Sequence, residues 1–260
     1  MNIVIVSSEA SLWKPLFVQR IIEGLPPEQK VAAVVLTPFK PPKVGKRKHL
    51  IRYATMLGPW VFLRMAVRES FHKGLDILSR VIPFKGVHSI AGVCRRHAIP
   101  VLHSTDVNDQ DTIDFMGSFA PDILLSSGNQ IFGKDVLALP AKACLNRHTS
   151  LLPAYSGIYP VFWCLLNGEK EVGVSVHTMT ERIDGGEVVA QASLPIRPGD
   201  TFFSLFEACF ALSVDVVLEA VHRIDAGDWE PIVNERKPSY YSYPTRADVR
   251  EFRRKGLKML

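Results

Sequence analysis

The sequence predicts an α/β fold: a Rossmann-like domain whose mostly parallel sheet is flanked by helices, with a helical insertion and a short C-terminal extension. The chain has 260 residues, of which 47% are hydrophobic, enough to bury the core of one domain of ordinary size. Short apolar runs typical of buried strands alternate with helical patterns, which is the rhythm of βαβ units. We expect the main domain at residues 1–227, its insertion at about 38–84 and the extension at 228–260.

Strands and helices alternate in the first half of the chain outside the insertion. The N-terminal residues M-N-I-V-I-V lack the basic lead and long apolar run of a secretion signal, so we expect them to form the first strand. The expected strands are 2–7, 31–36, 99–102 and 122–126, and the expected helices are 15–23 and 87–97. Ser7, Ser8 and Ser11 lie around the first turn, where capping of the first helix is their main expected role.

The insertion begins with a basic loop and continues as helix. Residues 37–48 include five basic residues and no acid, which suits either a clamp for a diphosphate or, as we favour, exposed and solvated chain. Residues 50–82 carry apolar positions at helical spacing on both sides of the breaker pair Gly58-Pro59. These positions include Trp60, Leu63, Val67, Phe71, Leu75 and Leu78. We expect this stripe to pack against the sheet or a second subunit, as in a homodimer. Contact with a membrane surface is the lesser alternative. The longest uncharged stretch of the segment is far shorter than the roughly 20 residues needed to span a bilayer.

The second half of the chain contains a predicted hairpin and a long closing helix. Apolar runs at 172–179 and 188–194 flank an Asp-Gly pair, a strong signal for a β-hairpin. A short buried helix follows Pro160, and a long amphipathic helix at 201–224 has Asp200 or Thr201 as its cap. The aromatic tail at 238–244 is expected to fold back onto the core, with stacking on a base or sugar as the alternative. A basic helix with a Thr-x-x-Asp capping pattern follows it.

The charge is divided unevenly along the chain, although the net value is only +5. Residues 1–100 hold 16 lysines and arginines against five acids, residues 101–227 hold seven against 16, and the remainder has a net charge of +3. The basic part can attract a phosphorylated substrate or a nucleic acid, or can be merely a solvated surface. The four cysteines show no C-x-x-C spacing, so we expect neither a zinc site nor disulfides, and a reducing cytoplasm as the location.

The segment 144–157, which reads C-L-N-R-H-T-S-L-L-P-A-Y-S-G, is the strongest candidate for a functional site. In an extended strand, Asn146, His148 and Ser150 share one face, and polar groups at the carboxyl end of a strand are typical of ligand sites in open α/β sheets. Pro153 stiffens the loop that follows. Taken alone, a histidine at a strand end is more often structural than catalytic. A second motif, around Asp184, makes a catalytic role for His148 the better interpretation.

The two motifs together resemble the folate-dependent formyltransferases. The patterns are N-x-H-x-S-L-L-P-x-x-x-G and G-x-S-V-H-x-M-x-x-x-x-D-G-G, and the similarity covers about residues 121–218. The family includes glycinamide ribonucleotide formyltransferase, the catalytic domain of methionyl-tRNA formyltransferase and the sugar N-formyltransferases. The resemblance implies N10-formyltetrahydrofolate as donor, a primary amine as acceptor, and Asn146, His148 and Asp184 as catalytic residues. It also implies folate contacts by Gln130, Ile131, Phe132, Met179, Thr180 and Asp184. The sequence contains no metal-ligand cluster, so no metal is expected.

The chemistry of formyl transfer suits these residue types. Attack of an amine on a formyl carbon needs a donor for the developing oxyanion, an acceptor for the amine proton and a donor for the leaving nitrogen. Asn146 has amide donors, His148 exchanges protons near neutral pH, and Asp184 can orient His148 or a water molecule. Ser150 is expected to contact the acceptor, and for Ser7 and Ser8 an acceptor contact is the alternative to their main expected role in capping. His177 also matches the family pattern, but a satisfied core histidine is the better interpretation, so it is left out of the catalytic set.

The acceptor is inferred by elimination. The chain has no glycine before Gly24, so it lacks the glycine-rich phosphate loop expected after the first strand for glycinamide ribonucleotide. About 30 residues after Gly227 do not suffice for the β-barrel of methionyl-tRNA formyltransferases, so tRNA is disfavoured. A nucleotide-linked amino sugar remains the first choice, and no DNA is expected. The alternatives are a methionyl-tRNA formyltransferase-like enzyme or one for another small amine, a formyltetrahydrofolate hydrolase, and a non-catalytic binding module.

Overall fold

The structure is a computed structural model that describes residues 1–8, 12–38, 45–82, 86–128 and 130–260. The predictions for Ser11 and for residues 39–44 of the basic loop lie outside the described residues. The elements of the first half are β1 (Asn2–Ser8), α1 (Lys14–Gly24), β2 (Lys30–Thr37), α2 (Lys46–Leu57), α3 (Pro59–Leu78), α4 (Ile90–Arg96), β3 (Val101–His103), α5 (Gln110–Gly117) and β4 (Ile123–Ser127). Those of the second half are α6 (Lys134–Leu137), β5 (Ala143–His148), β6 (Ser156–Gly157), α7 (Pro160–Asn167), β7 (Glu171–Thr178), β8 (Val188–Pro195), α8 (Phe202–Ala226), β9 (Tyr240–Tyr241) and α9 (Arg246–Arg254).

The main sheet has seven strands in the order β3-β2-β1-β4-β5-β7-β8. The strands from β3 to β5 are parallel, whereas β7 pairs antiparallel with β5 and β8 pairs antiparallel with β7. This arrangement confirms the predicted mostly parallel α/β sheet and the hairpin around the Asp-Gly pair. It also confirms that β4 and β5 are neighbours, so that their carboxyl ends lie side by side.

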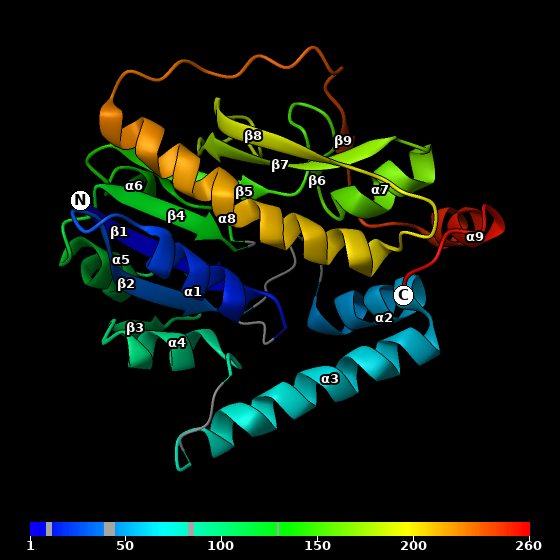
Figure 1. Ribbon diagram of the computed structural model, residues 1–260, viewed down its shortest axis with the longest axis horizontal. Helices are drawn as coiled ribbons and strands as arrows, with labels where there is room; N and C mark the ends of the chain where they lie inside the picture. The colour runs from blue at the N-terminus through cyan, green and yellow to red at the C-terminus, as the bar shows by residue number, and fades with distance from the viewer. Residues whose placement is uncertain (9–11, 39–44, 83–85, 129) are drawn as a thin grey trace.

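Helices cover both faces of this sheet (Figure 1). Alternate side chains of the central strands enter two separate cores, as expected when successive residues point to opposite faces. In β1, Ile3 and Ile5 join the core shared with α1, α4, α7 and α8. Val4 and Val6 join the smaller core under α5 and α6. The sequence pattern of continuous apolar strands therefore reflects burial on both sides.

Capping of the first helix was predicted incorrectly. Trp13 occupies the N-cap position of α1 without a side-chain hydrogen bond, and Ser7 and Ser8 belong to β1. The helix predicted at 87–97 begins at Ile90 because the Ser89 hydroxyl accepts a hydrogen bond from the Gly92 amide at 2.8 Å. The cap predicted for the long helix is confirmed, since Thr201 caps α8 in a capping box.

The insertion folds as two helices, but its apolar stripe does not pack against the sheet. The chain breaks at Gly58, whose φ of 81° is in the left-handed region, as the Gly-Pro pair predicted. The sheet-packing interpretation is wrong because α3 turns a different face to the core, that of Phe62 and Met65. Most of the predicted stripe is exposed: Trp60, Leu63, Val67, Phe71 and Leu78. Among the described residues, no helix combines the length and the apolar character required to cross a membrane.

The C-terminal extension packs on the main domain, which confirms the preferred interpretation of its aromatic residues. Strand β9 pairs in parallel with β6. Tyr241 stacks on Tyr155 and on Trp163, with ring centroids 5.2 and 4.7 Å apart. In α9, which begins with the predicted Thr245 capping box, Phe252 stacks on Phe162 of α7 at 4.6 Å. The extension therefore holds the loop that leaves β5.

Candidate active site

The site is built where β5 ends between a parallel and an antiparallel neighbour. Asn146 is paired with Ser126 of β4 on one side and with His177 of β7 on the other. His148 is the last residue of β5 and is buried. Because the carboxyl ends of parallel strands meet at one edge of the sheet, this position is the expected location of a ligand site.

Asp184 reaches this edge from the turn between β7 and β8. Its backbone has a φ of 50°, an uncommon value outside glycine, and its side chain is only 10% exposed. One carboxylate oxygen, Oδ2, accepts a hydrogen bond from the Gly157 amide at 2.8 Å. The other, Oδ1, lies 3.8 Å from Nδ1 of His148 and 3.7 Å from Nε2 of His177. The structure thus brings Asp184 close to the residues that end β5.

The hydrogen bonds of His148 assign a role to each ring nitrogen. Nε2 lies 3.0 Å from the Tyr155 carbonyl oxygen, which can only accept, so this nitrogen carries a proton. Nδ1 faces Asp184 and is the nitrogen left to gain or lose a proton. Burial lowers the pKa of His148 below the ordinary imidazole value, and the attraction of Asp184 opposes this without cancelling it. His148 is therefore neutral at neutral pH.

Asp184 stays ionised beside this neutral ring. Burial raises the pKa of its carboxyl group, but the closeness of His148 and His177 and the hydrogen bond from Gly157 outweigh that effect and bring the pKa down to about 2. A fixed negative charge next to Nδ1 stabilises the imidazolium that would form if His148 took up a proton. The pair is therefore arranged to accept a proton at Nδ1 and to hold it.

His177 is the residue that sequence reasoning left out. It is buried, as expected, and its Nδ1 donates to the Thr178 carbonyl oxygen at 2.7 Å. Its Nε2 is then free to accept from Nδ2 of Asn146 at 3.2 Å, which orients the amide. The signal was available: in a hairpin that ends near Asp184, an antiparallel β7 beside β5 places His177 opposite Asn146.

The serines predicted to contact an acceptor have structural partners instead. Ser150 is fully buried, and its hydroxyl donates to the Ala154 carbonyl oxygen at 2.9 Å, which closes the loop after β5. Ser7 is also fully buried. The hydroxyl of Ser8 accepts from Nζ of Lys14 at 2.5 Å. These contacts correct the expectation that the hydroxyls face a ligand, because buried and satisfied groups are not available to one.

Lys14 is a partly buried lysine at the same sheet edge. Its ammonium group also donates to the Ser127 carbonyl oxygen at 2.5 Å, at the carboxyl end of β4. Burial and the positive charge of Arg147 lower its pKa to about 7. No sequence pattern pointed to this lysine, since it lies at the start of a helix in an otherwise ordinary strand-to-helix connection.

The residues expected to contact folate lie around the loop after β4 and the end of β7. Gln130 ties this loop to the one after β3: its Oε1 accepts from the Val107 amide at 2.7 Å and its Nε2 donates to the Thr105 carbonyl oxygen. Phe132 is buried, whereas Ile131 is 54% exposed. At the end of β7, Met179 and Thr180 form the start of the Asp184 turn. The Met179 amide bonds to the Cys144 carbonyl oxygen at 2.8 Å. Gln130 thus ties its loop to the loop after β3, and Met179 ties the Asp184 turn to β5.

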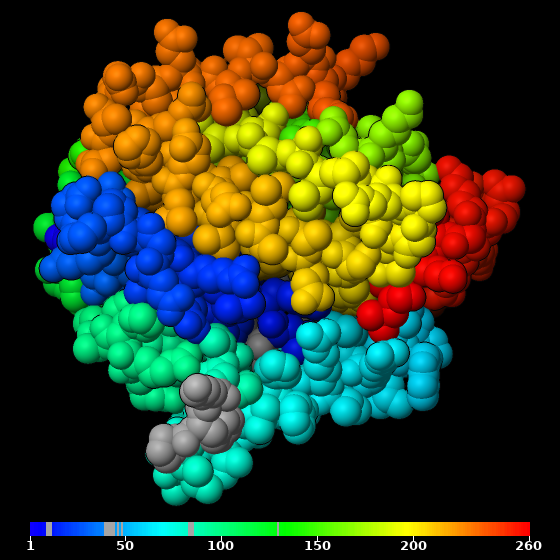
Figure 2. Space-filling view, viewed as in Figure 1, coloured from blue at the N-terminus to red at the C-terminus, as the bar shows by residue number. Residues whose placement is uncertain are grey.

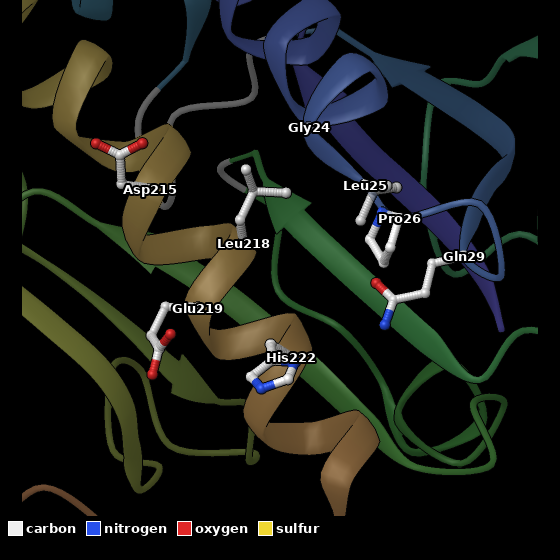
Figure 3. Close-up of a pocket in the computed structure, with 8 residues that line it drawn as sticks. All are labelled: Gly24, Leu25, Pro26, Gln29, Asp215, Leu218, Glu219 and His222. Carbon is white, nitrogen blue, oxygen red and sulfur yellow. The ribbon is translucent and has the colours of Figure 1, made fainter.

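Two surface hollows described in the structure lie elsewhere. One, of about 350 Å³, is bounded by the end of α1 and by α8 (Figure 3). The other, of about 440 Å³, continues along α8. The first lies where α1 connects to the amino end of β2, toward the opposite edge of the parallel strands, and neither includes a predicted site residue. Among the described residues, no group of three or more His, Cys, Asp or Glu is placed to hold a metal ion.

Comparisons with known proteins identify the family and the fold of the chain. A family model described as "Formyl transferase" matches residues 72–221. A methionyl-tRNA formyltransferase from Thermotoga sp. is 33% identical over 139 residues, which is 53% of this chain and 44% of that protein. The chain thus spans less than half the length of that relative.

Two solved structures share the fold. Glycinamide ribonucleotide transformylase 1 from Symbiobacterium toebii has a TM-score of 0.59 at 19% identity, covering 92% of each chain. An N-formyltransferase from Helicobacter canadensis, in complex with folinic acid and dTDP-3-aminofucose, has a TM-score of 0.55 at 18% identity, covering 93% of this chain and 71% of that one. The sequence resemblance and the predicted fold are therefore confirmed, and the chain belongs to the formyl transferase family.

Proposed function

We propose that the protein transfers a formyl group from N10-formyltetrahydrofolate to a primary amine. The observation that supports this most directly is the meeting of Asn146, His148 and Asp184 at the carboxyl edge of the sheet, with Oδ1 of Asp184 3.8 Å from Nδ1 of His148. An amide donor, a neutral imidazole and a buried carboxylate are the groups that acyl transfer to an amine requires. Membership of the formyl transferase family supports the same reaction.

Each residue has a definite task in this proposal. The amide of Asn146, oriented by His177, donates to the oxygen of the reacting carbonyl as negative charge develops there. Nδ1 of His148 takes the proton from the attacking amine, and the Tyr155 carbonyl holds the ring in position from the other side. Asp184 stabilises the resulting imidazolium, which then returns the proton to the leaving nitrogen. When bound, the folate supplies the formyl group.

The residues around the site fit a reduced folate. The Ile131 carbonyl oxygen accepts from the Asn108 side chain and the Met179 amide donates to the Cys144 carbonyl oxygen, so both segments are tied to the sheet edge, and the exposed Ile131 side chain offers an apolar surface to a pterin ring. In this proposal Gln130 and Thr180 support these two segments: Gln130 through its bonds to the neighbouring loop, Thr180 through a hydroxyl that accepts from the Arg182 amide at 3.2 Å. A buried carboxylate, Asp184, lies between them and the strand end.

We propose a nucleotide-linked amino sugar as the acceptor. The Helicobacter canadensis structure with dTDP-3-aminofucose has the same fold, and the ammonium group of the partly buried Lys14, when protonated, would attract a phosphorylated acceptor to the carboxyl ends of β1 and β4. Methionyl-tRNA is the second candidate, because a methionyl-tRNA formyltransferase is 33% identical over half of the chain. The two candidates differ in size and in the chemistry around the amine, so they can be distinguished directly.

A single-turnover assay tests the reaction itself. Enzyme in excess over N10-formyltetrahydrofolate is mixed with a panel of amines, and release of tetrahydrofolate and gain of one formyl mass by the amine are both followed. Release that requires an amine supports transfer. Release without any amine identifies a hydrolase, and the absence of release with every amine, including methionyl-tRNA, leaves only a binding module; either result contradicts the proposal.

The acceptor is then assigned by comparing rates. Nucleoside-diphosphate amino sugars with the amine at different ring positions are tested against methionyl-tRNA under identical conditions. A rate at least 100-fold higher with one amino sugar supports the proposed acceptor. A rate that is highest with methionyl-tRNA replaces it with the second candidate while leaving the formyl transfer proposal intact.

A further inference from the structure

The apolar stripe of α3 lies on the surface, opposite the face by which the helix is attached. Met65 is buried and Phe62 packs against the core, whereas Trp60, Val67 and Phe71 are 73%, 60% and 64% exposed. The exposed apolar residues of α3 and of the four residues after it are Trp60, Leu63, Val67, Phe71, Ile77, Leu78, Val81 and Ile82. Over the 20 residues of α3 alone, the stripe is about 30 Å long at 1.5 Å per residue. A continuous row of this length marks an interaction surface.

The attachment of α3 to α4 fixes this orientation. Asp76, on the inward face of α3, is 8% exposed. Its carboxylate accepts hydrogen bonds from the hydroxyl of Ser89 and from Arg80, and it lies 3.6 Å from Arg95 of α4. Turning the apolar stripe inward would expose Asp76 and break these bonds. Figures 1 and 2 show α3, in cyan, along one margin of the molecule, with its outer side free.

The exposed charges beside the stripe are all positive. Helix α2 contains no acidic residue, and the two acids of α3, Glu69 and Asp76, are half-buried and buried. Arg64 and Arg68 follow Trp60 at successive i+4 positions, so they run along one border of the stripe. The exposed basic residues of α2, α3 and the turn after α3, among those whose side chains are described, are Arg47, Arg64, Arg68, Lys73 and Arg80.

We propose that α3 docks the protein reversibly on an anionic phospholipid surface. A helix with Trp, Phe and Leu on one face and Arg and Lys beside them lies in the plane of a membrane, with its apolar face among the acyl chains near the headgroups and its cations at the lipid phosphates. Phe71 and Trp60, about 16 Å apart along the helix at 1.5 Å per residue, are the two aromatic anchors. The opposite face of α3, that of Phe62 and Met65, keeps its contacts with the core while the helix is bound to the membrane.

The positive charge beside the stripe favours an anionic lipid surface over two other binding partners, a second copy of the chain and a nucleic acid. A second copy of the same face would bring two rows of arginine together, which is unfavourable, whereas anionic headgroups neutralise the row formed by Arg64 and Arg68. Nucleic acid would use the basic residues but would leave the eight apolar side chains in water. The combination of apolar area and positive charge fits an anionic bilayer surface.

Vesicle flotation with the full chain tests the proposal. Wild-type protein is mixed with phosphatidylcholine vesicles that contain no or about 30% phosphatidylglycerol, at low and at high salt. We expect binding to the anionic vesicles, weakened by salt. Trp60→Ser/Phe71→Ser should lower the partition coefficient at least about a hundredfold, the loss expected for withdrawing two large apolar side chains from an apolar phase. Arg64→Glu/Arg68→Glu should remove the preference for phosphatidylglycerol.

Matched variants elsewhere control for general effects. Val233→Ser alters an apolar side chain that is 89% exposed outside α3, and Arg197→Glu/Lys237→Glu reverses two exposed charges on other segments. Both should bind like the wild type, and circular dichroism should show all variants folded. The proposal is overturned if the wild type does not bind anionic vesicles or if the α3 variants bind as well as the controls. It is overturned equally if light scattering shows a dimer that is lost only in Trp60→Ser/Phe71→Ser.

Discussion

Oδ2 of Asp184 accepts a hydrogen bond from the backbone amide of Gly157, 27 residues earlier in the chain, at 2.8 Å. This bond joins the turn between β7 and β8 to the loop that leaves β5. It also leaves Oδ1 directed at His148 and His177, which lie on the two strands. The position of the carboxylate is therefore set by backbone, and this has consequences that can be measured.

Asp184→Asn should lower turnover by about 10²- to 10⁴-fold, because the imidazolium of His148 loses its stabilising charge. Since the attraction of Asp184 raises the pKa of His148, its removal lowers that pKa further. His148 acts in its neutral form, so the acidic limb of the pH–rate profile should move to lower pH. Glu181→Gln, an exposed carboxylate in the same turn, is the control and should leave the profile in place. An unchanged limb in Asp184→Asn would contradict the assigned pair.

Asp184 should also make stability depend on pH in the acid range. Its folded pKa of about 2 lies below the value of 3.8 expected for the unfolded chain. The ionised carboxylate therefore stabilises the fold above about pH 4, and this contribution, about 2 kcal/mol, is lost as the pH falls towards 2. Urea unfolding of the wild type and of Asp184→Asn should give free energies of unfolding that converge between pH 5 and pH 2.5. If the difference between the two free energies of unfolding stays constant over this range, the neighbours of Asp184 do not lower the pKa of its carboxyl group.

The sequence was sufficient to predict the sheet and the meeting of the two motifs. Continuous apolar runs such as that of β1 indicated strands buried on both faces, and the Asp-Gly pair at 184–185 indicated the hairpin. Alternation along β5 placed Asn146 and His148 on one face at a strand end. The sheet and the hairpin follow from local pattern and from general rules for α/β sheets, whereas the meeting of Asp184 with the end of β5 was expected from the resemblance to the formyltransferases.

The errors arose where the outcome depended on contacts between distant segments. Periodicity showed that α3 has an apolar stripe, but the buried bonds of Asp76 to α4 decide which face is turned inward. Alternation also suggested that Ser150 continues the polar face of β5. The strand ends at His148, however, and the chain turns so that Ser150 bonds to Ala154. His177 was left out of the catalytic set because a buried, hydrogen-bonded histidine is usually structural. One of its hydrogen-bond partners, however, is Asn146.

Asn146→Ala should reduce turnover by about a hundredfold to a thousandfold, the usual loss when one donor to a developing oxyanion is removed. Asn146→Asp should be at least as damaging, since it replaces the amide donor by a negative charge of the same shape. The measurement is the single-turnover rate at saturating 10-formyltetrahydrofolate, with binding of 5-formyltetrahydrofolate followed by fluorescence to show that the folate site is intact. A loss below tenfold in both variants would exclude Asn146 as the oxyanion donor.

Gly157→Ala should destabilise the protein and lower activity, whereas Gly199→Ala should do so far less. Both glycines have left-handed φ values, 99° and 91°, so alanine is strained by about 1–2 kcal/mol at each. A Cβ at Gly157 would also lie 2.1 Å from the Tyr241 carbonyl oxygen, while nothing lies within 4 Å at Gly199. Separation of β9 from β6 would then shift the amide that holds Asp184. We expect a difference of at least about 2 kcal/mol in the free energy of unfolding between the two variants; equal losses would mean that the β6–β9 contact is not tight.

Ser239→Ala tests whether the C-terminal extension positions His148. The Ser239 hydroxyl accepts from the Tyr155 amide at 2.9 Å, and the carbonyl of the same Tyr155 is bonded to Nε2 of His148. Removing the hydroxyl leaves a buried amide unpaired and should cost about 1–3 kcal/mol in the free energy of unfolding. Because the bond to the Tyr155 carbonyl raises the pKa of His148, loosening this residue should also move the acidic limb of the pH–rate profile to lower pH. Ser242→Ala, at an exposed position three residues on, is the control. If Ser239→Ala lowers the free energy of unfolding but leaves the acidic limb of the pH–rate profile in place, the role of Ser239 is structural only. If the acidic limb also moves, the C-terminal extension helps to position His148.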